Sequence, residues 1–127
     1  MSKQTLSIIV VVAILVAGGI LLFILLRPPA SPMSGGPGML YFYSPTCPIC
    51  NGMKPVIAEL EEAYGGEFKI VRIDVTRPAG EDTARELGLV GQPNYVFFDS
   101  SDEETRRMAG PQSYEVMASE IERTLNR

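Results

Sequence analysis

The feature that most constrains the fold is an uninterrupted apolar segment near the N-terminus. Residues 6–26 read LSIIVVVAILVAGGILLFILL and contain no charged side chain. As a helix with a rise of about 1.5 Å per residue, this segment is about 30 Å long, which matches the hydrocarbon core of a bilayer. The remaining chain is too short to bury a helix that is apolar on every side. The sequence therefore predicts a transmembrane anchor at residues 6–26, after an N-terminal tail at residues 1–5.

A cleaved signal peptide is the main alternative to an anchor. The apolar region of a signal peptide usually has about 7 to 15 residues and ends in a small-x-small cleavage site. Here the run is longer and leads into Arg27, Pro28 and Pro29, which favours an uncleaved anchor. The α-amino group and Lys3 precede the run, and only Arg27 follows closely, so the positive-inside rule favours a cytoplasmic N-terminus. We therefore expect a single-pass protein of the cytoplasmic membrane with its domain on the outer face.

The rest of the chain divides into a linker and one small domain. Residues 27–38, RPPASPMSGGPG, are rich in Pro, Gly and Ser and predict a flexible linker. Residues 39–127 are expected to form one domain. The whole chain has 11 basic and 15 acidic residues; without Lys3 and Arg27, 9 basic and 15 acidic residues remain, a net charge of −6. Such a domain is poorly suited to binding nucleic acid or anionic lipid.

The domain shows the pattern of an α/β fold. Short apolar runs bounded by Gly, Pro or Asp predict strands, and apolar residues at helical spacing predict helices. Strands are expected at residues 39–44, 68–75, 94–99 and 105–108. Helices are expected from Pro48 to the glycine pair at 65–66, at residues 81–87, and from about residue 113 to 125. The order βαβαββα predicts a four-stranded mixed sheet with three helices, with parallel pairing across each helix and a hairpin at one edge.

Both cysteines of the chain lie where the first strand gives way to the first helix. Cys47 lies at the N-terminus of this helix, where unpaired N–H groups and the helix dipole favour its thiolate. The thiolate is the nucleophile in thiol–disulfide exchange. Cys50 lies one turn further into the helix and is expected to be more shielded. The spacing therefore predicts that Cys47 attacks and Cys50 resolves.

Three other interpretations of the cysteine pair stay open. A closed structural zinc site needs four ligands, and this chain offers two cysteines and no histidine, so carboxylates or a second chain would be required. A structural disulfide is possible, but it would close a very short loop and constrain the unfolded chain little. Two ordinary buried cysteines are the third possibility. The position between a strand and a helix favours the redox pair over all three.

Residues 39–125 resemble the thioredoxin superfamily. The resemblance rests on the CPIC motif at residues 47–50 after the first strand and on Pro55, which matches the family's helix-kinking proline. It also rests on LGLVGQPNYVFFD at residues 87–99, which is similar to the segment in which a cis-proline precedes a strand, and on Gly110 after the edge hairpin. A lone Cys-x-x-Cys is a weak signal, whereas these features in this order are specific.

The resemblance implies a trimmed thioredoxin-like fold and a site made of two segments. Cys47 and Cys50 would be catalytic, and Pro93 would be cis and face them. Gln92 could offer its backbone N–H and C=O to an extended substrate strand. Thr46, Pro48 and Ile49, which flank Cys47 in the sequence, complete the expected substrate-binding set with Gln92 and Pro93. The expected partners are protein thiol or disulfide clients and a membrane or soluble electron donor. The chain is expected to act as a monomer without a cofactor or metal.

Two departures from the family pattern bear on the chemistry. Thr46 stands where thioredoxins typically have a tryptophan, and Tyr41 stands where they have a buried aspartate that helps move the proton of the resolving thiol. Substrate or solvent would then have to take more of that role. The segment YSPTCPIC leans toward glutaredoxin, but the paired glycines that hold glutathione there are absent after the third strand. Glutathione binding is therefore not expected.

The sequence favours a membrane-tethered thiol–disulfide oxidoreductase that acts on protein disulfides. Pro48 and Ile49 bring no histidine or cation to stabilise the Cys47 thiolate further, which favours a reductase of exported clients over a strong oxidant. The alternative is a non-enzymatic thioredoxin-like adaptor that binds a membrane partner and carries a passive disulfide.

Overall fold

The computed structural model describes residues 2–26, 33 and 35–127, in two compact units, Met1–Ala30 and Ser31–Arg127. Most of the expected linker, residues 27–32 and 34, lies outside the described residues. The first unit contains one helix, α1 (Lys3–Leu25), whose N-cap Ser2 accepts a hydrogen bond from the N–H of Thr5. This 23-residue helix contains an 18-residue stretch with a mean hydropathy of 3.3, and its side chains are exposed. It is long and apolar enough to cross a membrane, a property shared by membrane anchors and signal sequences.

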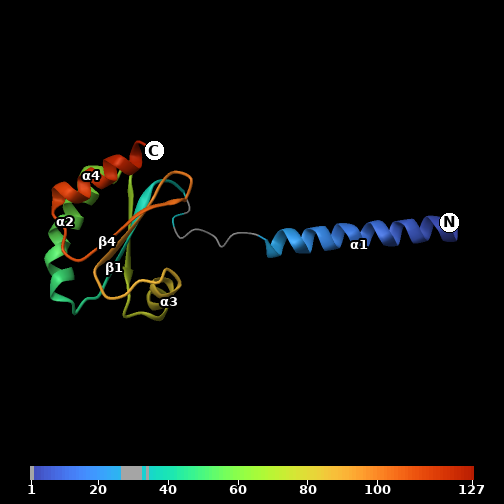
Figure 1. Cartoon of the computed structure of the whole chain (residues 1–127), viewed down its shortest axis with the longest axis horizontal. Helices are drawn as coiled ribbons and strands as arrows, with labels where there is room; N and C mark the ends of the chain where they lie inside the picture. Colours follow the sequence, from blue (N-terminus) through green and yellow to red (C-terminus); the bar gives the residue numbers. More distant parts are fainter. Residues whose placement is uncertain (1, 27–32, 34) are drawn as a thin grey trace. The chain divides into compact units, whose positions relative to one another are not determined.

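The second unit holds a mixed four-stranded sheet with the strand order β2-β1-β3-β4 (Figure 1). Its elements follow the predicted order βαβαββα and so confirm the predicted fold class. They are β1 (Gly38–Tyr43), α2 (Pro48–Tyr64), β2 (Lys69–Asp74), α3 (Pro78–Glu86), β3 (Asn94–Phe98), β4 (Glu104–Ala109) and α4 (Tyr114–Leu125).

The pairing of the strands differs from the prediction at one connection. β1 and β2 are parallel, as predicted, but β3 runs antiparallel to β1 although a helix precedes it. Asp74 at the end of β2 lies level with Tyr43, and Asn94 at the start of β3 lies level with Phe42. The chain therefore leaves and re-enters the sheet at the same end. The nine residues of α3 rise about 14 Å, less than the about 20 Å of a six-residue strand, so this helix does not carry the chain back across the sheet.

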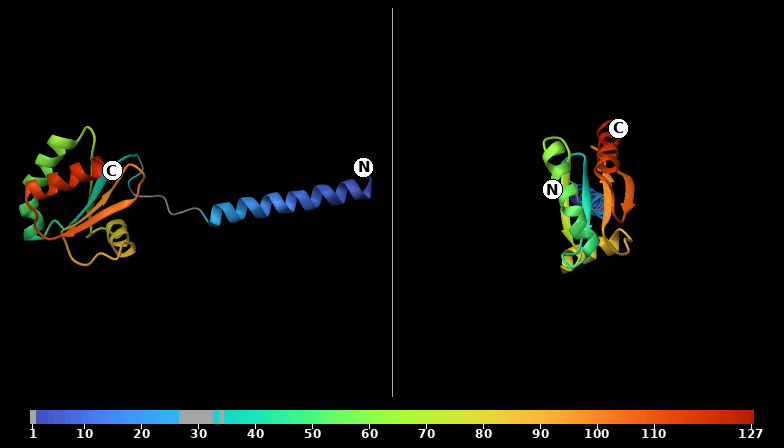
Figure 2. Two further views of the ribbon diagram at one scale, coloured as in Figure 1. Left: turned by 45° about the horizontal axis from the view of Figure 1, so that its top comes forward. Right: turned by 90° about the vertical axis from the view of Figure 1, so that its left-hand side faces the viewer.

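The helices cover both faces of the sheet. Figures 1 and 2 show α2 and α4 together on one face and α3 on the other. β1 and β3 occupy the centre of the sheet and are buried along nearly their whole length. The core beneath α2 and α4 consists of Met39, Tyr41, Met53, Ile57, Leu60, Phe68, Tyr95, Phe97, Met117, Ala118 and Ile121. The core on the α3 face consists of Met33, Leu40, Phe42, Val96 and Phe98.

Prolines mark the start of two helices. In α2, Pro48 occupies the first turn, where the missing N–H costs no hydrogen bond, and Pro55 lies inside the helix as predicted. In α3, Pro78 likewise begins the helix, three residues before the predicted start at Glu81. The predicted start depends on apolar residues at helical spacing, and the first turn of α3 contains few apolar residues.

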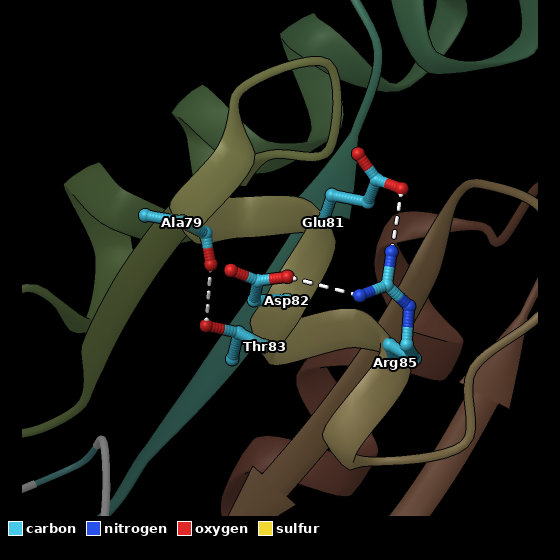
Figure 3. Close-up of polar contacts among 5 residues, drawn as sticks. All are labelled: Ala79, Glu81, Asp82, Thr83 and Arg85. Carbon is cyan, nitrogen blue, oxygen red and sulfur yellow. Dashed lines mark hydrogen bonds and ion pairs between the residues drawn. The ribbon is translucent and has the colours of Figure 1, made fainter.

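Helix α3 is exposed on its outer side and carries local polar contacts (Figure 3). Arg85 pairs with Glu81 at 2.7 Å and with Asp82 at 3.1 Å, and the Thr83 hydroxyl donates to the carbonyl of Ala79 at 2.8 Å. Exposed helical ion pairs of this kind contribute about 0.3–0.5 kcal/mol each. Packing against the sheet therefore matters more for the position of α3.

Gly80 makes this packing possible, and its replacement should destabilise the domain. A Cβ atom at this position would overlap the backbone carbonyl of Asp74, where α3 crosses the end of β2. We expect Gly80→Ala to lower the free energy of unfolding by about 1–3 kcal/mol. The matched control is Gly52→Ala in α2, where a Cβ atom meets nothing within 4 Å. Removing this helical glycine should raise stability by about 0.5–1 kcal/mol. Urea unfolding of the full chain in detergent measures both, and equal effects would contradict the close approach.

Candidate functional site

Cys47 is the N-cap residue of α2. Its backbone is extended, with φ −80° and ψ 117°, and its Sγ accepts a hydrogen bond from the N–H of Cys50 at 3.3 Å. Its own N–H donates to the carbonyl of Ser44 at 3.2 Å, and its carbonyl accepts from Asn51 at 3.0 Å. The strand-to-helix turn thus aims backbone donors at the sulfur, which is the arrangement that stabilises an anion at a helix N-terminus.

The two thiols have different surroundings. Both are free, but Cys47 is half-buried and Cys50 is only 1% exposed. A hydrogen bond from the Cys50 thiol holds the pKa of Cys47 below its usual range, and the backbone N–H groups of Cys50 and Ile49 lower this pKa further. Burial raises the pKa of Cys50, and the hydrogen bond to Cys47 adds to this effect. Cys47 therefore ionises more readily than an ordinary cysteine, and Cys50 ionises less readily.

A second segment lies against Cys47. The Gln92–Pro93 peptide bond is cis, as predicted, and the Gln92 carbonyl oxygen lies 4.0 Å from Cys47 Sγ. Gly91 precedes it with φ +70°, a conformation that favours glycine. The buried Asn94 holds this loop, since its Nδ2 donates to the carbonyl of Gly91 at 2.6 Å. The structure therefore brings together the two segments that the sequence predicted to meet.

The other predicted substrate-binding residues surround the thiol on the surface. Thr46, Pro48 and Ile49 are exposed, as is Gln92, whereas Pro93 is buried. The Thr46 hydroxyl lies 3.0 Å from the Ser44 hydroxyl, so the loop before Cys47 is held by side chains as well as by backbone. An exposed rim around a half-buried thiol leaves room for an extended chain to approach it. The substrate-binding roles of these residues stay predictions.

Sequence reasoning missed a cavity behind Cys50. Its volume is about 270 Å³, and it is lined by Tyr41, Tyr43, Pro45, Cys50, Lys54 and Arg72. The ring of Tyr41 stacks between those of Tyr43 and Tyr95, with centroids 5.5 and 5.4 Å apart, and its hydroxyl donates to the Cys50 carbonyl at 3.4 Å. Burial, with a smaller contribution from Cys50, raises the pKa of Tyr41 to about 12. The sequence marks Tyr41 only as a departure from the pattern of the thioredoxin superfamily and does not point to the cavity.

The described residues show no group of three or more His, Cys, Asp or Glu side chains placed to hold a metal ion.

The pKa difference between the thiols predicts selective alkylation. Because the thiolate reacts, Cys47 should be modified by iodoacetamide with a midpoint below the ordinary cysteine pKa of about 8.5, and Cys50 should react slowly. Cys50→Ala removes the thiol donor and should move the Cys47 midpoint to higher pH. Cys50→Ser keeps a hydroxyl donor and should move it less. Mass spectrometry of the alkylated chain between pH 5 and 10 measures these curves, and coincident curves for the two variants would contradict the proposed hydrogen bond.

Comparison with known proteins places this site in context. The thioredoxin family model matches residues 33–123. The thioredoxin-like protein HCF164 of Arabidopsis thaliana chloroplasts is 27% identical over 83 residues, which is 64% of this chain and 32% of that protein. A thiol:disulfide interchange protein TxlA homolog of Synechocystis is 26% identical over 88 residues, which is 69% of this chain and 49% of that protein. The chain thus spans about a third of the length of the first of these curated relatives and about half of the length of the second.

Solved structures show the same fold. Mitochondrial thioredoxin 3 of Saccharomyces cerevisiae in its oxidised form superposes with a TM-score of 0.62 at 21% identity, over 71% of this chain and 80% of that one. Thioredoxin O2 of Arabidopsis thaliana in its oxidised state gives a TM-score of 0.62 at 20% identity, over 73% of this chain and 78% of that one. The family-model match at residues 33–123 begins close to β1 and covers the sheet, both cysteines and the Gln92–Pro93 loop.

Proposed function

Because the chain belongs to the thioredoxin family, we propose that it is a thiol–disulfide oxidoreductase in which Cys47 is the nucleophile and Cys50 the resolving thiol. The observation that carries this proposal is the position of Cys47 Sγ at the N-cap of α2, where it accepts the Cys50 N–H at 3.3 Å. This position favours the thiolate form of Cys47, and Cys47 is also the thiol that reaches solvent, whereas Cys50 is buried.

The reaction consists of two exchange steps. The Cys47 thiolate attacks one sulfur of a client disulfide, forms a mixed disulfide and releases the other client sulfur as a thiolate. Cys50 then loses its proton and attacks Cys47 Sγ, which releases the second client thiolate and leaves a Cys47–Cys50 disulfide. Two electrons pass from the dithiol to the client, and solvent protonates the released thiolates. A thiol reductant must then restore the dithiol.

The client would lie along the Gln92–Pro93 segment. The Gln92 carbonyl already lies beside Cys47 Sγ, and its backbone groups can pair with an extended client strand, as in other cases of strand addition. Thr46, Pro48 and Ile49 would contact the client on the other side of the sulfur. This arrangement fits unfolded or extended segments of protein clients better than a small thiol.

The apolar helix α1 supports a role at a membrane. Its length and composition suit a single span, and the Lys3 side of the helix would stay in the cytoplasm. The domain of residues 39–127 would then act on the outer face of the cytoplasmic membrane as a monomer, and its clients would be exported proteins. In an oxidising compartment a protein of this kind needs electrons from a membrane or soluble donor. The absence of a cation or histidine between the cysteines favours reduction of clients over their oxidation.

A trapping experiment tests the proposal. In Cys50→Ser the resolving step is blocked, so mixed disulfides between Cys47 and its clients should accumulate in cells and be visible on non-reducing gels. They should disappear on addition of dithiothreitol. The control is the double variant Cys47→Ser/Cys50→Ser, which should trap nothing. If the single variant also traps nothing, the pair is not an exchange site, and the adaptor role becomes the better interpretation.

A further inference from the structure

The resolving step of the proposed mechanism requires a proton acceptor close to Cys50. The Cys50 thiol is 1% exposed and must lose its proton before it can attack. The described residues that line the cavity behind it include no carboxylate, and the chain contains no histidine. Tyr41 is not a suitable base, because its hydroxyl donates to the Cys50 carbonyl and its pKa is raised to about 12.

The cavity instead carries positive charge. Lys54 lies four residues after Cys50 on α2, and positions four apart face the same side of a helix. Arg72 on β2 lines the same cavity and is oriented by Glu61, whose carboxylate accepts from its Nε at 2.9 Å and from its Nη2 at 2.8 Å. Counting Glu61, the cavity still has one positive charge in excess. The hydroxyl groups of Tyr41 and Tyr43 add polar lining, so the site suits a small anion.

We propose that this cavity binds a small carboxylate, which accepts the proton of the Cys50 thiol in the resolving step. The inference rests on the proposed function, because it assigns a proton acceptor to that reaction. The volume of about 270 Å³ is room for several water molecules at about 30 Å³ each, and therefore for a formate or acetate ion with some water. The carboxylate can come from solution or from an Asp or Glu side chain of the client.

The step balances without a further reactant. The proton of Cys50 Sγ–H passes to the carboxylate, and the resulting carboxylic acid returns it to solvent. The Cys50 thiolate attacks Cys47 Sγ, so the Cys47–Cys50 bond forms while the bond between Cys47 and the client sulfur breaks. Lys54 and Arg72 hold the carboxylate in place and are positioning residues. In this scheme the base is a bound carboxylate that can exchange, and it takes the place of a buried carboxyl side chain of the protein itself.

Stopped-flow reaction of the reduced full chain in detergent with 4,4′-dithiodipyridine separates the two steps. This uncharged disulfide releases one thiopyridone when Cys47 attacks and a second when Cys50 resolves. The measurement uses a zwitterionic buffer at constant pH, with formate replacing chloride at constant ionic strength. We expect formate to accelerate the second phase about tenfold or more with saturation, below the roughly 10²–10⁴-fold effect of a permanently positioned base. A second phase that does not depend on formate would rule out solution as the source of the carboxylate, while the first phase would still uphold the proposed function.

Variants and client peptides complete the test. Lys54→Gln should abolish the saturable response to formate, whereas Lys69→Gln, an exposed lysine of β2 that does not line this cavity, should keep it. If clients supply the carboxylate, a peptide with a Glu beside its cysteine should leave the mixed disulfide with Cys47 faster than its Gln counterpart. This comparison is made without formate. If formate accelerates the second phase and the Glu of the peptide does not, the carboxylate comes from solution. If neither formate nor the Glu of the peptide accelerates the second phase, the inference is overturned. If the first phase is lost, the proposed function is overturned together with the inference.

Discussion

Cys47→Ser is expected to lower the rate of thiol–disulfide exchange by at least about a thousandfold, because a serine hydroxyl is not ionised at neutral pH. The fold should be unaffected. Cys47 is half-buried and caps α2, and serine is among the preferred N-cap residues. Reduction of a protein disulfide by the full chain in detergent, with a chemical reductant to restore the dithiol, measures the loss.

The matched variant is Cys50→Ser, which keeps the nucleophile and removes only the resolving thiol. It should release one leaving group per chain in a single turnover and then stop as a mixed disulfide. Activity that survives in Cys47→Ser but not in Cys50→Ser would reverse the two assignments. The different burial of the thiols argues against that reversal, since only Cys47 reaches solvent.

Phe97→Ala is expected to cost about 3–5 kcal/mol of the free energy of unfolding, the usual loss when a buried phenylalanine is truncated. Phe97 is 0% exposed in β3, and the centroid of its ring lies 6.2 Å from the centroid of the Phe68 ring. A domain of this size has about 5–15 kcal/mol of stability in total, so this loss removes a large share of it. Urea unfolding of the full chain in detergent, followed by circular dichroism, measures the change.

Two controls bracket this effect. Phe97→Leu keeps most of the buried volume and should lose less than half as much stability. Val116→Ala changes a side chain of α4 that is 48% exposed and should stay within about 0.5 kcal/mol of the parent. A cost below that of Val116→Ala would mean that Phe97 is not part of a packed core.

The order of elements could be predicted because local signals for it are strong. Pro48 and the glycines after Tyr64 delimit α2, and the apolar run of β1 reads as a strand buried on both faces. The direction of β3 could not be predicted from the rule that a helix joins parallel strands. That rule assumes a connection that crosses the sheet, and the length and path of α3 are set by its packing against the end of β2, which involves Gly80.

The parts of the candidate site also differ in how far the sequence predicts them. The cysteine pair and the cis-proline segment are each continuous in the sequence, so the resemblance to a known family was enough to predict that they meet. The cavity behind Cys50 combines Tyr41 from β1, Lys54 from α2 and Arg72 from β2. Only the register of β1 with β2, in which Tyr41 and Arg72 lie level, brings these residues together. The role of Asn94 as support of the loop was also invisible, because a polar residue at the start of a strand has no distinctive spacing.

The direction of β3 has a practical consequence. Because β3 ends level with Gly38, the turn at residues 99–103 lies at the opposite end of the sheet from both cysteines. Its residues 100–102 are exposed, and exposed turns of polar residues are preferred sites for accepted insertions. A fluorescent reporter or an affinity peptide inserted there would stand about a strand's length from the reacting sulfurs. Such a chain could be followed in living cells while its clients are captured at an unobstructed thiol.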